Sequence, residues 1–373
     1  MATLKYYLTS LEPNMAQTIF SQSIGGYCSN SLLYPETTLS ANVGLYDLNL
    51  SLDTPTGGWG QWTSAEYINI NGEMMAVAPI SSGSVIVSQR GSNNIIQMHI
   101  AGDVVRANST KELFNDVLND NYKQYRCIAV KNVSLETDPS SDQVASDLSV
   151  WIEQNSRQAD TTIRIALEIP KSQYYTGVST SRTSLTLTDS SLVGRYPDDF
   201  FKDAYLQIGS QGAVIHSFES STGTFTYVSS FSTSTVNAIY EVLPGPAQRV
   251  KSGTVAPVST SYISPFLSAT PSTPVHLSQT VDVSAGDDIY PNYLFYIWVE
   301  REIKKGSAGM HNDDFVISVK YDTSYRSISS PPVTSSSSSS SSGSSSSSSS
   351  TSSTVASSSS SSGSSSSSSS SNP

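Results

Sequence analysis

The sequence predicts an all-β protein: a small β-barrel or hairpin module, an antiparallel β-sandwich carrying a second hairpin module, and a disordered serine-rich tail. Two short apolar runs, Met74 to Ile80 and Val85 to Val87, flank a turn at 81–84, a pattern typical of a β-hairpin. A weaker copy recurs at 205–231, where glycine-bearing turns separate three short apolar runs. Alternating apolar and polar residues, which favour half-buried strands, occur at 43–52, 124–133, 148–153, 162–169 and 184–188.

The N-terminal third is expected to contain an arm followed by the small module. Residues 1–42 mix prolines and glycines with short apolar pieces, which predicts an extended N-terminal arm that lies on a neighbouring subunit. Residues 43–123 are expected to form the small β module. One short amphipathic helix is predicted within it, at Thr110 to Leu118.

The remainder is expected to be a sandwich and a tail. Residues 124–328 predict a β-sandwich with the second hairpin module inserted at about 195–245. Two strands, Leu294 to Arg301 and Asp314 to Tyr321, are expected to pair as a long hairpin that completes it. Residues 329–373 are nearly all serine. Because serine buries almost no apolar area, this low-complexity segment is predicted to be disordered.

The charge distribution argues against nucleic acid as a partner. The formal net charge is −11, with 20 basic residues scattered among 31 acidic ones. Binding to phosphates requires clustered Lys and Arg, and the densest basic group, at 301–305, has Glu300 and Glu302 in or beside it. No window approaches eighteen uninterrupted apolar residues, so no membrane span is expected either.

The residues that carry chemistry in other proteins form no recognisable site here. Cys28 and Cys127 have neither metal-site nor redox-motif spacing and are expected to be free thiols, although a disulfide stays open. The oxygen ligands at 311–314 would suit Ca²⁺, but their spacing does not match an EF-hand loop. His99 and His216 are expected to be partly buried, satisfied side chains. We therefore predict no catalytic residue, no metal and no cofactor.

Three aromatic residues, Trp59, Trp62 and Tyr67, cluster near one loop of the small module. Flat rings with polar tips can stack on a sugar, so these residues are the candidate carbohydrate contacts. Core packing or a subunit interface is the favoured interpretation of the same rings.

One group of residues resembles a module found in tailed-bacteriophage virion proteins. In that module a strand that ends in Gly-Glu is followed by a hairpin, an Arg-Gly turn and a His-x-Ala-Gly closure. The matching positions here are Gly72, Glu73, Arg90, Gly91, His99, Ala101 and Gly102. Three further stretches, at 23–31, 125–132 and 298–322, look like the same kind of protein, whereas the polyserine tail departs from it.

The resemblance implies a structural component of a tailed-phage virion, in the tail, baseplate or fibre apparatus. Such a protein is assembled in the bacterial host cytoplasm and contacts other virion proteins and copies of itself, which predicts a symmetric homo-oligomer. The match carries no catalytic residue, and its glycines are interpreted as turn formers.

Three other functions stay open. A capsid decoration protein would also be structural but would bind the head of the particle. A carbohydrate-binding adhesin with a serine-rich stalk would use Trp59, Trp62 and Tyr67 as its contacts. A glycan-cleaving enzyme needs only two suitably placed carboxylates, which 31 acidic residues always offer.

Overall fold

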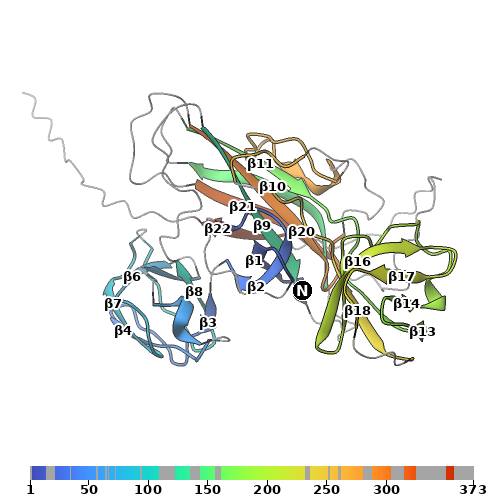
Figure 1. Cartoon of the computed structure of the whole chain (residues 1–373). Helices are drawn as coiled ribbons and strands as arrows, with labels where there is room; N and C mark the ends of the chain where they lie inside the picture. The colour runs from blue at the N-terminus through green and yellow to red at the C-terminus, as the bar shows by residue number, and fades with distance from the viewer. Residues whose placement is uncertain are drawn as a thin grey trace, which may run out of the picture.

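The described residues of the chain form four antiparallel sheets, which confirms the prediction of an all-β protein. The structure is a computed structural model and describes residues 2–13, 22–33, 35–55, 58–63, 65, 67–71, 73–92, 95–108, 122–134, 143–155, 161–231, 236–250, 253–258, 262–279, 288–303, 315–324 and 350–356. Figure 1 shows a central sandwich with a six-stranded unit at one end and a seven-stranded unit at the other. The helix predicted at 110–118 and the oxygen ligands at 311–314 lie outside the described residues.

The sandwich consists of a five-stranded and a four-stranded sheet. The first has the order β11 (Thr161–Glu168), β20 (Leu294–Ile303), β9 (Tyr122–Asn132), β1 (Leu4–Ser10), β2 (Tyr27–Leu32). The second has the order β19 (Val275–His276), β10 (Val144–Asn155), β21 (Phe315–Ser324), β22 (Ser350–Ala356). Apolar side chains from both sheets, such as Val130, Ile297 and Val319, form one shared core.

The prediction of an extended arm at 1–42 is wrong, because this segment supplies strands to two sheets. β1 lies between β9 and β2, and its Leu4 and Leu8 are buried in the sandwich core. The glycines that suggested an arm lie in the connection between β1 and β2. At Gly26, where φ is +107°, a Cβ would meet the carbonyl oxygen of Ser10 at 2.2 Å. Glycine therefore lets two backbones approach closely here.

The long hairpin predicted from 294–301 and 314–321 does not form. β20 pairs with β9 and β11, whereas β21 pairs with β10 and β22 in the opposite sheet. β20 is buried on both faces: Ile297 faces the inter-sheet core, and Trp298 faces a second cluster that includes Ala247 and Ile263. A strand covered on both faces has a nearly continuous apolar sequence without clear alternation, so the pattern does not indicate which sheet it joins.

The residues predicted as an inserted hairpin module lie in a seven-stranded unit that begins earlier than residue 195. Its strand order is β12 (Tyr175–Val178), β18 (Ile239–Leu243), β15 (Tyr205–Ile208), β16 (Gln211–Glu219), β17 (Thr224–Tyr227), β14 (Thr186–Thr188), β13 (Ser181–Arg182). The strand at 184–188, predicted to belong to the sandwich, thus pairs inside this unit. Aromatic side chains fill its core, among them Phe201, Phe218 and Phe225.

The six-stranded unit contains the predicted small β module. Its strand order is β3 (Glu36–Thr38), β8 (Val104–Asn108), β5 (Tyr67–Ile70), β6 (Glu73–Val77), β7 (Ser84–Gln89), β4 (Asn49–Ser51). β6 and β7 form the predicted hairpin. The strand expected over 43–52 is shorter, and only 49–51 pair with β7. β5–β6–β7 and β15–β16–β17 are both three-stranded meanders, as the repeated pattern predicted.

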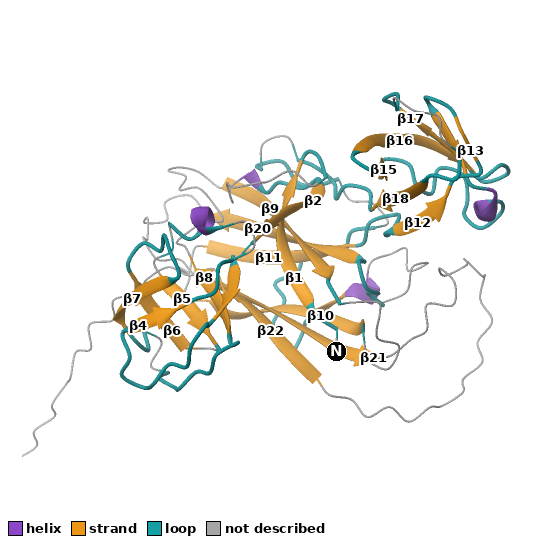
Figure 2. Cartoon of the chain, turned by 90° about the horizontal axis from the view of Figure 1, so that it is seen from below, coloured by secondary structure: helices purple, strands orange, loops and turns teal. Residues whose placement is uncertain are grey.

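One segment of the serine tail, β22, is described by the structure. It pairs antiparallel with the outer edge of β21, from Asp322 opposite Ser350 to Val316 opposite Ala356. Figure 2 shows it at the edge of the sheet, beside β21. Serine content alone did not predict this strand, and the rest of the tail lies outside the described residues. Within the described chain, no helix is long and apolar enough to cross a bilayer.

Candidate interaction surface

A buried ion pair lies at the centre of the six-stranded unit. Glu73 opens β6 and is fully buried, and Arg90 follows directly after β7. The guanidinium donates two parallel hydrogen bonds to the carboxylate, Nε to Oε1 at 2.8 Å and Nη2 to Oε2 at 2.8 Å. This bidentate geometry is the strongest form of a carboxylate–guanidinium contact and fixes both side chains in orientation.

His99 and the backbone of Gln97 complete the environment of this carboxylate. The Gln97 N–H donates to Glu73 Oε2 at 3.0 Å, and His99 Nε2 lies 2.9 Å from the same oxygen. Burial raises the pKa of Glu73, but the bonds from Arg90, Gln97 and His99 outweigh that effect and lower it below its usual range. Because an ionised carboxylate has no proton to donate, His99 Nε2 must carry one. His99 Nε2 is therefore a buried hydrogen-bond donor. The expectation of a partly buried, satisfied imidazole is only half met, because the ring is almost fully buried and its Nδ1 has no hydrogen-bond partner among the described residues.

The same ion pair holds two loops against the hairpin. Besides Glu73, Arg90 donates to the carbonyl oxygen of Gly44 through Nη1 and to that of Gln97 through Nη2, the latter at 2.6 Å. The backbones of Val43 and His99 exchange two hydrogen bonds, of 2.8 and 3.0 Å. Loops 44–48 and 95–100 therefore lie side by side, tied to one buried guanidinium. We call Glu73, Arg90 and His99 the buried charge cluster.

These two loops carry an unusual amount of exposed apolar surface. Tyr46 is 91% exposed, Met98 71% and Ile100 65%. Among the described residues, nine of the nineteen exposed large apolar side chains belong to the six-stranded unit. We define the docking face as Leu45, Tyr46, Leu48, Ile96, Met98 and Ile100. Large exposed apolar patches on proteins mark interaction sites.

The predicted aromatic contacts do not form a platform. Trp62 is fully buried in the core of the six-stranded unit, so its ring cannot stack on a ligand. Trp59 is partly buried and packs edge-on against it, with 5.9 Å between ring centroids. Tyr67 is partly exposed on β5. The interpretation of these rings as core packing is confirmed for Trp62, and the carbohydrate interpretation is wrong for it.

The remaining predicted residues have simple structural positions. Cys28 and Cys127 are unpaired, so the expectation of two free thiols is confirmed. His216 is exposed on β16, which corrects the expectation that it is partly buried, because the strand places alternate residues toward water. Within the part of the chain that the structure describes, no three His, Cys, Asp or Glu side chains converge as metal ligands.

The residues that resemble the phage module are those that build the buried charge cluster. Glu73, Arg90 and His99 are its three members, and Gly91 and Gly102 have φ values of +60° and +93°, as turn formers do. Gly72 lies outside the described residues.

The docking face itself was not predicted from the sequence. The sequence did offer one signal, the apolar run Ile95–Ile96–Gln97–Met98–His99–Ile100 soon after Gly91. In the structure this run forms no regular strand.

Comparison of the chain with protein-family models, curated proteins and solved structures finds no match.

Proposed function

We propose that this chain is a structural component of a tailed-phage virion, in the tail, baseplate or fibre apparatus, and that it holds its neighbours through the docking face. The observation that carries the proposal is the combination of exposed apolar loops and the buried charge cluster that fixes them. The resemblance to virion proteins supports it because it falls on the members of that cluster.

The energetics of the cluster favour a positioning role. Removing two charges from water costs several kcal/mol, and an apolar replacement of similar volume is often as stable as a buried ion pair. Stability alone is therefore a poor reason for Glu73 and Arg90 to be buried. Their distinctive effect is that the Arg90 guanidinium binds the carbonyl oxygens of both Gly44 and Gln97, and so holds the two loops next to each other. A surface whose loops are already ordered loses less conformational entropy on binding.

The docking face has the chemistry of a subunit contact. Tyrosine and methionine are enriched in the centres of protein interfaces, where they bury large areas at a modest entropy cost. If the proposal holds, the docking face binds copies of the same chain and other virion proteins in a symmetric assembly.

Sedimentation velocity of the purified chain over a range of concentrations tests this function. We expect wild type to associate and Met98→Glu to stay monomeric, because the new carboxylate would be buried against an apolar surface. Val228→Glu is the matched control: Val228 is 68% exposed but belongs to the inserted unit. A wild-type chain that is monomeric at every concentration and never joins particles would contradict the proposal.

Capsid decoration is distinguished by location. A tail component is expected at the tail or baseplate of labelled particles, whereas a decoration protein would be found on the head.

A further inference from the structure

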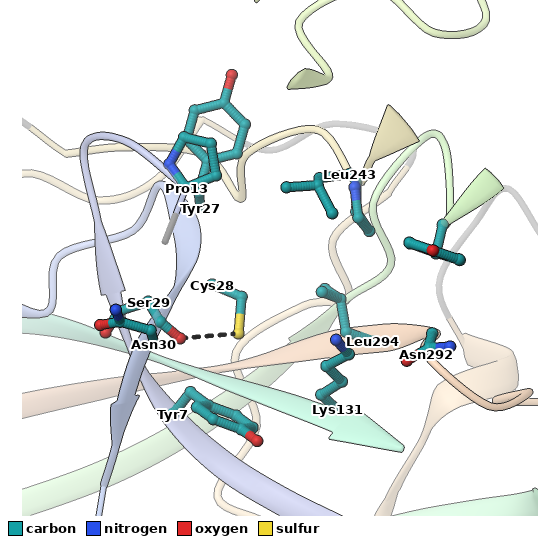
Figure 3. Close-up of a pocket in the computed structure, with 12 residues that line it drawn as sticks. Tyr7, Pro13, Tyr27, Cys28, Ser29, Asn30, Lys131, Leu243, Asn292 and Leu294 are labelled. Atoms are coloured by element: carbon teal, nitrogen blue, oxygen red, sulfur yellow. Dashed lines mark hydrogen bonds between the residues drawn. The ribbon is translucent and has the colours of Figure 1, made fainter. Parts of the chain in front are cut away.

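A cavity of about 290 Å³ lies between the sandwich and the inserted unit, away from the docking face. Its floor comes from β1, β2 and β9, and its roof from the segments that enter and leave the inserted unit. Figure 3 shows the β2 residues on one side of the cavity, with Leu243, Leu294 and Lys131 on the other.

A bulge in β2 lies at this space. Tyr7 pairs with Leu32, but Thr9, two residues later on β1, pairs with Cys28, four residues earlier on β2. The extra residues on β2 leave the ladder, and the Ser31 N–H donates to Ser29 Oγ at 2.8 Å within the bulge. Asn30, between them, is exposed at the rim. The residues of the bulge, Ser29 and Asn30, thus line the cavity, and bulges commonly redirect side chains at functional sites.

The roof is held in place by several independent contacts. The Tyr27 hydroxyl donates to the carbonyl oxygen of Asp203 at 2.8 Å. Gly26 and Ala247 exchange backbone bonds of 3.2 and 3.1 Å. The Gln173 carboxamide donates to the carbonyl oxygen of Leu294 at 2.9 Å and accepts from its N–H at 3.1 Å. These contacts pin both connections of the inserted unit, so the cavity has a defined shape without a ligand.

The lining combines a cation, neutral polar groups and apolar walls. Within the described residues, neither the Lys131 ammonium nor the Asn30 carboxamide has an ion-pair or hydrogen-bond partner. Burial raises the pKa of Tyr7 to about 12, so its phenol keeps its proton at neutral pH and can donate a hydrogen bond. Leu243 and Leu294 supply apolar surface at the opposite wall.

We infer that this cavity binds a single acidic sugar unit, with Lys131 against its carboxylate and with Asn30 and Tyr7 against its hydroxyl groups. The volume lies at the lower end of ligand pockets, of roughly 300–1,000 Å³, and so suits one ring. One cation among several neutral donors and acceptors matches a ligand with one carboxylate and several hydroxyls. The leucine walls match the C–H face of a pyranose ring.

The experiment titrates the ¹⁵N-labelled full chain with glucuronate and with glucose, which differ by the C6 carboxylate, and follows amide shifts by NMR. We expect glucuronate to shift amides of β2 and β9 near Asn30 and Lys131, and to bind at least about tenfold more tightly than glucose, since a charged hydrogen bond is worth about 1.5–3 kcal/mol. Lys131→Met should remove that preference and keep the apolar stem of the side chain.

Two further variants test whether binding depends only on the overall charge of the protein and whether a loss of binding reflects misfolding. Lys320→Met removes an exposed lysine on β21, far along the other sheet, and should leave binding unchanged. Asn30→Asp adds a competing carboxylate at the rim and should weaken glucuronate binding, while its melting temperature stays that of wild type.

The inference is overturned if glucuronate produces no shifts around the cavity, or if glucose binds equally well. It is also overturned if acetate shifts the same amides with the same affinity, because the site would then recognise an anion and not a sugar. None of these outcomes depends on the docking face, so the proposed virion role is tested separately.

Discussion

Two buried glutamates show how the same side chain acquires opposite properties in this protein. Glu73 is paired with a guanidinium, and its pKa is lowered. Glu168, at the end of β11, is 4% exposed, and its partners among the described residues are neutral donors, Trp298 Nε1 at 2.6 Å and the Gln248 N–H at 3.1 Å. Burial dominates there and raises the pKa of Glu168 to about 7. The sequence does not distinguish the two, because the difference lies in partners far along the chain.

Replacing Arg90 with methionine should destabilise the six-stranded unit by about 3–5 kcal/mol, because the Glu73 carboxylate would remain buried without its partner. Hydrogen exchange of the β5–β8 amides measures the local free energy of opening. Arg106→Met is the control. Arg106 pairs with Glu36 at 2.9 Å but is 52% exposed, so a loss of about 0–1 kcal/mol is expected. Equal losses for the two variants would contradict the account of the buried charge cluster.

Glu168→Gln should change how stability depends on pH. The folded pKa of about 7 lies above the usual 4.5, so the folded state holds this proton more tightly than the unfolded chain does. The resulting stabilisation is fully present below about pH 4.5 and is lost as the pH rises through about 7, a total on the order of 3 kcal/mol.

The glutamine variant should lack that component. Urea unfolding at a series of pH values checks this. Parallel pH profiles for the two proteins would show that Glu168 does not titrate in this window.

Local sequence patterns predicted individual hairpins and meanders well, whereas they did not predict which strands pair over long distances in the sequence. The hairpin of β6 and β7 and the meander of β15, β16 and β17 followed from turn chemistry between short alternating runs. The partners of β20 and β21 could not be predicted in this way, because the chain passes from one sheet to the other between these two strands. β1 was missed since three successive residues, Lys5 to Tyr7, are partly exposed and interrupt the alternation that marks a strand.

The candidate site was predicted only in part, for a related reason. The sequence places Trp59 and Trp62 near each other, and they do pack together, but it does not say whether a ring lies in the core or at the surface. The docking face depends on two loops that meet through Arg90, which is a tertiary contact. His99 was expected to be structural, but its partner Glu73 lies 26 residues earlier and could not be assigned.

Deleting residues 2–12 should abolish cooperative folding of the sandwich. This deletion removes β1 from between β9 and β2 and takes Leu4 and Leu8 out of the core. Deleting 329–373 should leave the sandwich folded, because β22 is an edge strand with a single neighbour. Circular dichroism and thermal melting compare the two proteins. A melting temperature unchanged by the first deletion would restore the extended-arm interpretation.

At the scale of the whole molecule, the chain has a three-part layout that separates its two surfaces. The docking face lies on the six-stranded unit, and the cavity lies beside the seven-stranded unit at the other end of the sandwich (Figure 1). On the proposed function, one end would hold neighbouring subunits and the other would present the ligand cavity. The sandwich between them, with a shared core from both sheets, would keep the two at a fixed separation.

The most direct measurement is the location of the chain on tailed-phage particles assembled in a host that expresses a tagged copy, by immunogold electron microscopy. We predict label at one repeated site on the tail or baseplate for wild type and for Val228→Glu, and none for Met98→Glu. Wild-type particles without label, or Met98→Glu particles labelled as fully as wild type, would contradict the claim that the docking face holds this protein in a virion.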